Sequence, residues 1–393
     1  MTMKEKVFKR VFLVVIDSFG VGAEPDWAEY GDDPSLNTAL HVIDDRPAPS
    51  FLWSRGLGYL LKEEPIKQPS VVAKLQELSK GKDSTTGHWE IAGLVMTTPF
   101  PTYPHGFPPE VMEEFERRIG TKTLGNFPAS GTEIIKQLGE EHMRTGYPIV
   151  YTSADSVFQI AAHEDVIPVE DLYRMCEIAR ELLTGDHAVA RVIARPFAGK
   201  PGEFYRTPRR RDFSLPPLGH TILDELVEKG IPVVAVGKIH DLFAGRGISQ
   251  SVHTENDAEG IKALQELSKT FQQRGLVFAN LVDSDMIYGH RRNVEGYYQN
   301  IMMIDEGLSL LYDNLTNEDL LIVTADHGND PTFPKHTDHT REYVPFIACS
   351  PSFTEGSFLG TLRGYVHIAQ TVIEALGVES ARKWGRTLLK EDV

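Results

Sequence analysis

Residues 11–22, with the sequence VFLVVIDSFGVG, contain the pattern that decides the fold. The run 11–16 is apolar and rich in β-branched residues, and Asp17, Ser18 and two glycines follow it. An uninterrupted apolar run of this length is typical of a strand buried on both faces of a parallel sheet. We therefore expect an inner strand here, with Asp17 directly after its carboxyl end.

Four later runs share this apolar pattern, at residues 231–236, 276–282, 320–324 and 345–349. Helical patterns lie between or beside them, at about residues 221–229, 257–273, 295–315 and 366–376. Strands that alternate with helices predict an α/β fold with a largely parallel sheet.

Two proline-rich stretches, 97–109 and 195–218, bracket the middle of the chain. Prolines at this density cannot continue a helix or an inner strand. The segment between them has its own helix and strand signals, so we expect a domain inserted on two connectors. The expected division is a discontinuous core of residues 1–101 and 217–393 and an inserted domain of residues 102–216. One large domain with long loops is the alternative.

The net charge and the composition of the chain exclude some classes of binding partner. The chain has 393 residues, which favours two or three domains, and its 40 basic and 56 acidic side chains give a net charge of −16. This charge repels nucleic acid and anionic membranes, so we expect neither as a partner. The two cysteines fit a reducing compartment, and no apolar stretch approaches the roughly 18 residues of a membrane helix. We expect a soluble cytoplasmic protein.

Acidic residues and histidines follow the predicted strands where each strand ends. Any one of them alone is more often a cap or turn residue, but the carboxyl ends of parallel strands meet at one edge of the sheet. Several carboxylates there repel one another unless cations neutralise them, so we predict two divalent metal ions. Oxygen and nitrogen ligands suit manganese, zinc or magnesium better than copper or iron–sulfur clusters. The candidates are Asp17, Asp283, Asp285, His290, Asp326, His327, His336, Asp338 and His339.

The segment KDSTTGHWE, residues 82–90, offers hydroxyl groups at the start of a predicted helix. Serine or threonine at such a position is most often only an N-cap. However, a helix N-terminus also supplies free amides and positive potential for a phosphate, and a metal can activate a hydroxyl for attack on phosphorus. Lys82 and His88 are candidates to hold charge near the transferred group.

Six segments, in the same order, resemble the bacterial phosphopentomutase family of the alkaline phosphatase superfamily. The likeness runs from about residue 8 to the C-terminus, and the Asp-His-Gly element alone would indicate only the superfamily. The resemblance implies an alkaline phosphatase-like three-layer α/β/α core with an inserted α/β cap domain. The segments are VIDSFGVG (15–22), GKDSTTGHWE (81–90), YTSADSVFQ (151–159), DSDMIYGHRR (283–292), TADHGND (324–330) and TDHTRE (337–342).

The resemblance also implies two metal positions and a nucleophile. The family is usually manganese-dependent, and its nucleophile is a threonine that carries a phosphoryl group. The matching position here, directly after Asp83, is Ser84, and Thr85 is the alternative if the loop shifts by one residue. The implied ligands are Asp17, Ser84, Asp326 and His327 for one metal, and Asp285, His290 and His339 for the other.

The resemblance implies substrate contacts mainly in the inserted domain. Arginines there are candidates for a phosphate, because a guanidinium fork matches phosphate oxygens. The alternative for each arginine is a surface ion pair, which we prefer for the run 209–211. The implied contacts are Ser153 and Asp155 to sugar hydroxyls, Val157 and Ile193 packing against the sugar, and Arg191, Arg206 and Lys238 to the phosphate that does not react.

The implied reaction interconverts ribose 1-phosphate and ribose 5-phosphate, and the 2-deoxyribose equivalents, through a phosphoenzyme and a 1,5-bisphosphate. The implied activator is a sugar bisphosphate, either glucose 1,6-bisphosphate or ribose 1,5-bisphosphate. We expect a small-molecule pentose phosphate as a partner. We also expect a monomer, with an oligomer left open. Three alternatives remain: a phosphomonoesterase or phosphodiesterase of the same superfamily, a cofactor-independent phosphoglycerate mutase, and a non-catalytic metal-binding module.

Overall fold

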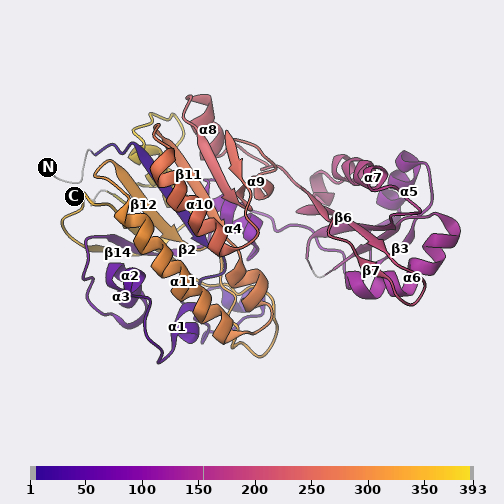
Figure 1. Ribbon diagram of the computed structural model, residues 1–393, viewed down its shortest axis with the longest axis horizontal. Coiled ribbons are helices and arrows are strands. Elements are labelled where there is room, and N and C mark those ends of the chain that lie inside the picture. Colours follow the sequence, from indigo (N-terminus) through magenta and orange to yellow (C-terminus); the bar gives the residue numbers. More distant parts are fainter. Residues whose placement is uncertain (1–5, 154, 390–393) are drawn as a thin grey trace. The chain divides into compact units, whose positions relative to one another are not determined.

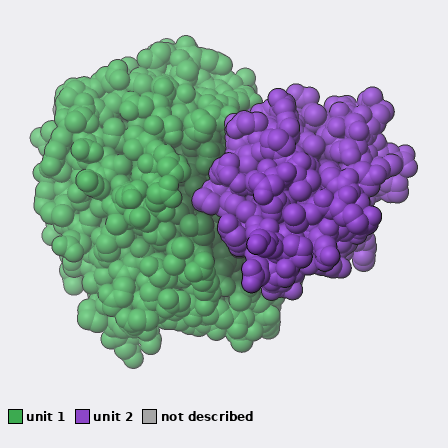
Figure 2. Space-filling model, turned by 45° about the vertical axis from the view of Figure 1, so that its right-hand side comes forward, with its two compact units in different colours: residues 1–98, 217–393 green, residues 99–216 purple. Residues whose placement is uncertain are grey.

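The computed structural model describes residues 6–153 and 155–389. The chain divides into two compact units, coloured separately in Figure 2. Unit 1 consists of Met1–Thr98 and Pro217–Val393, and unit 2 is Pro99–Pro216. The first boundary therefore follows Thr98, where residue 101 was expected, and the second lies between Pro216 and Pro217.

The described part of unit 1 contains an eight-stranded sheet in the order β10-β9-β11-β1-β12-β13-β2-β14. Strand β1 lies inside the sheet, parallel to both β11 and β12, and every residue of β1 is buried. The strands are β1 (Arg10–Ile16), β2 (Val71–Gln76), β9 (Val233–Gly237), β10 (Gln250–Val252), β11 (Gly275–Leu281), β12 (Asp319–Thr324), β13 (Val344–Cys349) and β14 (Ser357–Arg363).

Strand β13 runs against the direction of the neighbouring strands β12 and β2. The 19 residues between Thr324 and Val344 contain no helix that would carry the chain across the sheet to the amino ends of the strands. The chain therefore turns at the carboxyl edge and returns from it, as antiparallel neighbours do. The sheet is largely parallel, with β13 as the exception.

Helices cover both faces of the unit 1 sheet and give three layers (Figure 1). On one face α11 packs against α1, α2 and α10, and on the other α12 packs against α4 and α8. The predicted helical patterns correspond to α8, α10, α11 and α12, with ends that differ by three residues at most. The helices are α1 (Thr38–Ile43), α2 (Ser50–Leu52), α3 (Gly58–Lys62), α4 (Ser84–Ile91), α8 (Ile222–Glu228), α9 (Ile239–Leu242), α10 (Asp257–Thr270), α11 (Val294–Asp313) and α12 (Val366–Ala375), with shorter turns η2 (Trp27–Tyr30), η3 (Trp53–Leu57) and η5 (Ser284–Gly289). No described helix combines the length and the apolar composition that a membrane crossing requires.

Unit 2 is a separate α/β body with its own sheet, in which β8 pairs with β6 beside the order β3-β4-β5-β6-β7. One apolar cluster lies beneath α5 and α7 and includes Phe115, Phe158 and Leu172, and a second cluster lies beneath α6 and includes Ile134 and Phe197. Two cores of its own explain why this segment forms a compact unit. Its elements are α5 (Pro109–Ile119), β3 (Leu124–Pro128), α6 (Gly131–Thr145), β4 (Ile149–Thr152), β5 (Val157–His163), α7 (Val169–Leu182), η4 (Gly185–His187), β6 (Arg191–Ala198), β7 (Tyr205–Arg206) and β8 (Arg211–Ser214).

A buried ion pair joins the amino ends of β1 and β12. Arg10 Nε donates to Asp319 Oδ1 at 2.6 Å, and its Nη2 donates to Asp319 Oδ2 at 2.7 Å. The remaining guanidinium nitrogen donates to the carbonyl oxygens of Ser268 and Phe271. This bidentate geometry satisfies both charges, so the pair fixes the edge of the sheet opposite the ends that carry Asp17 and Asp326.

Replacing Arg10 with alanine should lower the free energy of unfolding by about 3–5 kcal/mol, because Asp319 keeps a buried charge without its partner. Denaturant titration followed by tryptophan fluorescence measures this loss in unit 1, since all four tryptophans lie there. Lys9→Ala, at the exposed neighbouring position, is the matched control and should change stability by no more than about 0.5 kcal/mol. Equal stability of the two variants would contradict the role given to this ion pair.

Candidate active site

The carboxyl ends of β11, β1 and β12 carry most of the predicted metal ligands. The register aligns Ile16 of β1 with Leu281 of β11, and Val15 with Thr324 of β12, so these three strands end together. Asp17, Asp326 and His327 follow β1 and β12 directly, and Asp285 lies in the turn η5 after β11. All four side chains are buried.

Asp17, Asp326 and His327 form one group of candidate ligands whose donor atoms lie within 4.8 Å of one another. His327 Nε2 is 3.4 Å from Asp17 Oδ1 and 3.4 Å from Asp326 Oδ2. These two carboxylate oxygens are buried and have no hydrogen-bond partner among the described residues. The Oγ of Ser84 lies 3.1 Å from the same histidine nitrogen, so a hydroxyl group faces this cluster.

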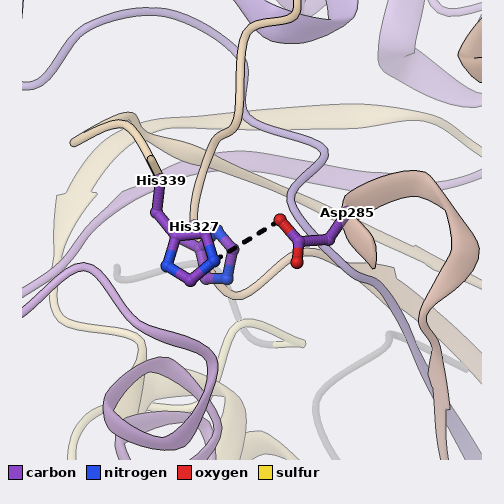
Figure 3. A group of neighbouring side chains, drawn as sticks. All are labelled: Asp285, His327 and His339. Atoms are coloured by element: carbon purple, nitrogen blue, oxygen red, sulfur yellow. Dashed lines mark ion pairs between the residues drawn. The ribbon is translucent and has the colours of Figure 1, made fainter. Parts of the chain in front are cut away.

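Asp285, His327 and His339 form the second group, drawn in Figure 3. His339 Nε2 is 3.5 Å from Asp285 Oδ1, and His290 Nε2 is 3.2 Å from Asp285 Oδ2. The two histidine nitrogens also approach each other to 3.1 Å. Because His327 belongs to both groups, the two candidate metal positions adjoin.

Burial and mutual repulsion perturb these groups strongly. Burial raises the pKa of Asp17 well above its usual range, and the carboxylates of Asp326 and Asp285 raise it further. Burial opposes ionisation of Asp285 too, but His339 and His290 outweigh it and hold the pKa of Asp285 well below its usual range. Against its own burial, the pKa of His339 rises to about 10 beside Asp285. A divalent cation would satisfy both the repelling carboxylates and the unpartnered oxygens, and oxygen–nitrogen donors fit this role.

Two asparagines outside the groups of candidate ligands donate hydrogen bonds to the ligand carboxylates. Asn280 Nδ2 donates to Asp17 Oδ2 at 3.0 Å, and Asn329 Nδ2 donates to Asp285 Oδ1 at 2.8 Å. Such contacts fix the direction in which a ligand points and are commonly essential to metal affinity. Neither asparagine is among the site residues predicted from the sequence, although Asn280 is recognisable as a polar residue inside the apolar strand β11.

Helix α4 holds Ser84 against the first group. Asp83 caps the helix by accepting from the backbone N–H of Thr86, and the Nδ1 of His88 lies 2.8 Å from the carbonyl oxygen of Ser84 and 3.1 Å from Asp326 Oδ2. A Cβ at Gly87 would lie 2.4 Å from the carbonyl oxygen of Asp326, so only glycine allows this close approach. The helix is thereby fastened to the segment that follows β12.

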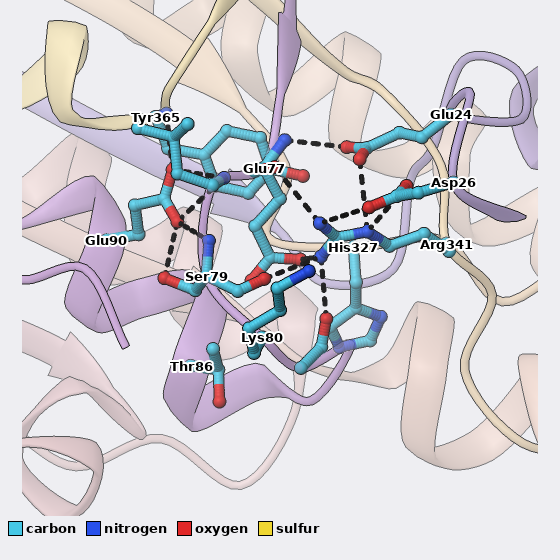
Figure 4. Close-up of polar contacts among 12 residues, drawn as sticks. Glu24, Asp26, Glu77, Ser79, Lys80, Thr86, Glu90, His327, Arg341 and Tyr365 are labelled. Carbon is cyan, nitrogen blue, oxygen red and sulfur yellow. Dashed lines mark hydrogen bonds and ion pairs between the residues drawn. The ribbon is translucent and has the colours of Figure 1, made fainter. Parts of the chain in front are cut away.

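Buried Arg341 connects the loop of His339 with the segment that leads to Ser84 (Figure 4). Its guanidinium pairs with Glu24 at 3.1 Å and with Asp26 and Glu77, and it donates to the carbonyl oxygen of Gly81 at 2.7 Å. Burial raises the pKa of Glu24 to about 9 despite this arginine. No sequence pattern indicates this network, because its members lie far apart along the chain.

Three candidates from the sequence have other partners. Asp283 accepts a hydrogen bond from the backbone of Asp257 at 2.9 Å, and His336 Nε2 lies 2.9 Å from Asp32 Oδ1. Asp338 lies 3.7 Å from the ammonium group of Lys82. These three side chains therefore belong to neither group of candidate ligands.

The predicted substrate contacts lie on different elements. Val157 and Ile193 are each 2% exposed, on the paired strands β5 and β6 of unit 2. Arg191 begins β6, whereas Arg206 of β7 pairs with Phe197, six residues further along β6. The two arginines therefore lie at different ends of this strand. The remaining contacts are Ser153, whose Oγ accepts from the backbone N–H of Asp155, and Lys238, whose Nζ lies 3.6 Å from Met286 Sδ in unit 1.

Comparisons with known proteins agree with this geometry. A family model described as Metalloenzyme superfamily matches residues 221–380. The chain is 57% identical over 377 residues to a phosphopentomutase of Caldanaerobacter subterraneus subsp. tengcongensis, and 54% identical over 382 residues to that of Dictyoglomus turgidum, with 95% of each chain covered in both cases. A phosphoglycerate mutase structure from Leishmania mexicana has a TM-score of 0.51 at 13% identity, covers 98% of both chains, and bears on the fold alone. The predicted alkaline phosphatase-like α/β/α core is confirmed.

Replacing Asn280 with alanine should weaken divalent metal binding by about 10- to 100-fold, because Asp17 loses the donor that orients its carboxylate. Calorimetric titration of the metal-free protein with Mn²⁺ measures this change. Asn314→Ala is the matched control, since Asn314 lies beyond α11 and donates to the carbonyl oxygen of Leu310. Identical affinities for the two variants would show that Asn280 does not support a metal ligand.

Proposed function

The chain belongs to the phosphopentomutase family, and from this membership we propose how its residues act. It is an enzyme that interconverts ribose 1-phosphate and ribose 5-phosphate, and the 2-deoxyribose equivalents. Since each sugar gains one phosphoryl group from the enzyme and gives one back from its other position, the net reaction is an isomerisation. The observation that carries the assignment of the nucleophile is the hydroxyl of Ser84, 3.1 Å from His327 and beside two carboxylate oxygens that accept no hydrogen bond among the described residues.

We propose that two divalent ions, with Mn²⁺ as the physiological metal, bind at the two groups of ligands. When bound, such ions lower the pKa of a hydroxyl and neutralise the charge of a phosphoryl group in transfer. One buried oxygen of Asp17 and one of Asp326 accept no hydrogen bond among the described residues and have only histidine nitrogens nearby, which supports this proposal, since a buried carboxylate needs a cation or a donor. The proposed ligands are Asp17, Ser84, Asp326 and His327 for one ion, and Asp285, His290 and His339 for the other.

Ser84 is the proposed carrier of the phosphoryl group. It is the first residue of α4, where the free backbone amides and the helix dipole stabilise a phosphate. In the first transfer the free hydroxyl of the sugar replaces Ser84 Oγ on phosphorus, which gives a 1,5-bisphosphate. In the second transfer Ser84 Oγ displaces the sugar oxygen at the other position and regains a phosphoryl group. A sugar bisphosphate such as glucose 1,6-bisphosphate or ribose 1,5-bisphosphate would supply the initial phosphoryl group.

The proposed substrate contacts divide between sugar and phosphate. Ser153 and Asp155 are proposed to bind the sugar hydroxyls, beside Val157 and Ile193. Because a guanidinium matches phosphate oxygens in a fork, arginine is the natural partner of the phosphate that does not react. The proposed phosphate contacts are Arg191, Arg206 and Lys238.

The proposed compartment is a reducing one such as the cytoplasm. Cys176 and Cys349 are both buried and unpaired in disulfides, and free thiols of this kind are usual where disulfides do not persist.

Incubation with glucose 1,6-bisphosphate should add one phosphoryl group to the wild-type chain, and intact mass with site mapping should locate it on Ser84. Ser84→Ala should lose both the added mass and the mutase activity, whereas Thr85→Ala, the matched control, should keep both. Phosphorylation of Ser84→Ala with loss in Thr85→Ala would move the nucleophile by one residue. Phosphate release without a sugar acceptor, as fast as isomerisation, would indicate a hydrolase of the same superfamily.

Replacing Arg206 with alanine should raise KM for ribose 5-phosphate by about 10- to 100-fold and change kcat less, because one charge-assisted hydrogen bond to the substrate is lost. Steady-state kinetics measures both constants. Arg209→Ala is the matched control in the same stretch, since Arg209 pairs with Glu164 in the described structure. If both variants keep the wild-type KM, Arg206 does not bind the phosphate.

A further inference from the structure

A cluster of one imidazole and two carboxylates lies in unit 1, apart from the candidate active site. His220, Glu225 and Glu228 place one donor atom each within 4.8 Å of one another. His220 Nε2 is 3.4 Å from Glu225 Oε2 and 3.9 Å from Glu228 Oε2. We propose that these three residues bind a zinc ion, beyond the function proposed above.

The distances between the donor atoms match the size of the ion. Zinc bonds to imidazole nitrogen and carboxylate oxygen measure about 2.0–2.1 Å, and a tetrahedral arrangement then separates the donors by about 3.3–3.4 Å. The contact between His220 and Glu225 already has this length. Glu228 needs a shift of about half an ångström, which its side chain, 65% exposed, is free to make. The exposed side also leaves a path for entry and a fourth position for water.

The local backbone presents the three side chains together. Glu225 and Glu228 are three residues apart on α8, so they share one face of the helix. His220 stands just before the helix, whose start is fixed by a capping box between Thr221 and Asp224. Arg246 donates to Asp224 Oδ1 and to the carbonyl oxygen of Pro217, each at 2.8 Å, and so holds both ends of this turn.

The imidazole of His220 is oriented as a zinc ligand would be. Its Nδ1 faces Asp224 Oδ2 at 4.0 Å, while its Nε2 faces the two glutamates. The separation of 4.0 Å is too long for a hydrogen bond, so only the Nε2 of His220, which faces both glutamates, supports its role as a ligand. Glu225, whose side chain is 10% exposed, pairs with a histidine that is charged only when protonated, so a zinc ion would give this carboxylate a permanent counter-charge.

The three proposed ligands lie within residues 220–228, close to the point where unit 1 resumes. His220 lies three residues after Pro217, the first residue of the second segment of unit 1. The next turn is already attached to the first segment, because Ile222 N–H donates to the carbonyl oxygen of Ala92 at 2.9 Å. A ligand that binds only the folded arrangement raises the stability of that arrangement, so zinc should stabilise unit 1.

Equilibrium dialysis of the full chain against Zn²⁺, with metal analysis, tests the proposal. His220→Ala and Glu228→Gln should each bind one zinc ion fewer than the wild type, because all variants keep the same active-site ligands. Zinc should also raise the thermal unfolding midpoint of both variants less than that of the wild type. Glu228→Gln guards against misfolding, since this side chain is exposed.

The matched control is His253→Ala, which removes the histidine of an exposed His253–Glu255 pair that no third candidate ligand joins among the described residues. This control should bind as many zinc ions as the wild type, and the three variants at His220, Glu228 and His253 should keep their mutase activity with Mn²⁺. An unchanged zinc count in Glu228→Gln, or an equal loss in His253→Ala, would overturn the zinc site. Neither result would bear on Ser84 or on the proposed function.

Discussion

Three carboxylates buried at the ends of three adjacent parallel strands impose the constraint on which the rest of unit 1 depends. Asp17, Asp285 and Asp326 are buried within one small region, where like charges repel and desolvation is costly. Two of their oxygens have no hydrogen-bond partner among the described residues, so the site is arranged for a cation. The parallel register of β11, β1 and β12 brings these residues together, and the pair of Arg10 with Asp319 fixes the other edge of the same strands.

The same constraint explains the second layer of polar contacts. A carboxylate that must meet a cation in one direction has to be held in that direction beforehand. Asn280 donates to Asp17 Oδ2 and leaves Oδ1 facing His327, whereas Asn329 donates to Asp285 Oδ1, the oxygen that also faces His339. Arg341, in the loop of His339, has a similar role. It donates to the carbonyl oxygen of Gly81, in the segment just before Ser84, and so connects the two. The loop with the second group of ligands and the start of α4 are thus held by one buried guanidinium, and neither can shift without breaking its ion pairs.

The sequence predicted those parts of the fold in which all residues of an element are buried alike. The inner strands β1, β11 and β12 are buried on both faces and read as plain apolar runs, whereas the edge strands β10 and β14 are partly exposed and left no such signal. The antiparallel direction of β13 depends on the path of the loop before it, and hydrophobic periodicity does not encode the path of a loop. Within that loop, His336 and His339 are the same residue type three positions apart, and only their partners, Asp32 and Asp285, distinguish them. The division of ligands between two metals came from the family resemblance, since residue types alone do not encode it.

The serine at position 84 fits this arrangement at small cost. The threonine expected from the family has a Cβ methyl group that restricts the side-chain rotamer, and serine gives up that restriction. The backbone at Ser84 is held independently, because His88 contacts its carbonyl oxygen and Gly87 packs directly against Asp326. The remaining freedom is therefore one torsion with three staggered wells, and selecting one of them costs at most on the order of 0.6 kcal/mol. That is less than the hydrogen bond which Ser84 Oγ can form with a charged or polar partner at 3.1 Å, so the geometry around α4 rather than the methyl group determines where the hydroxyl points.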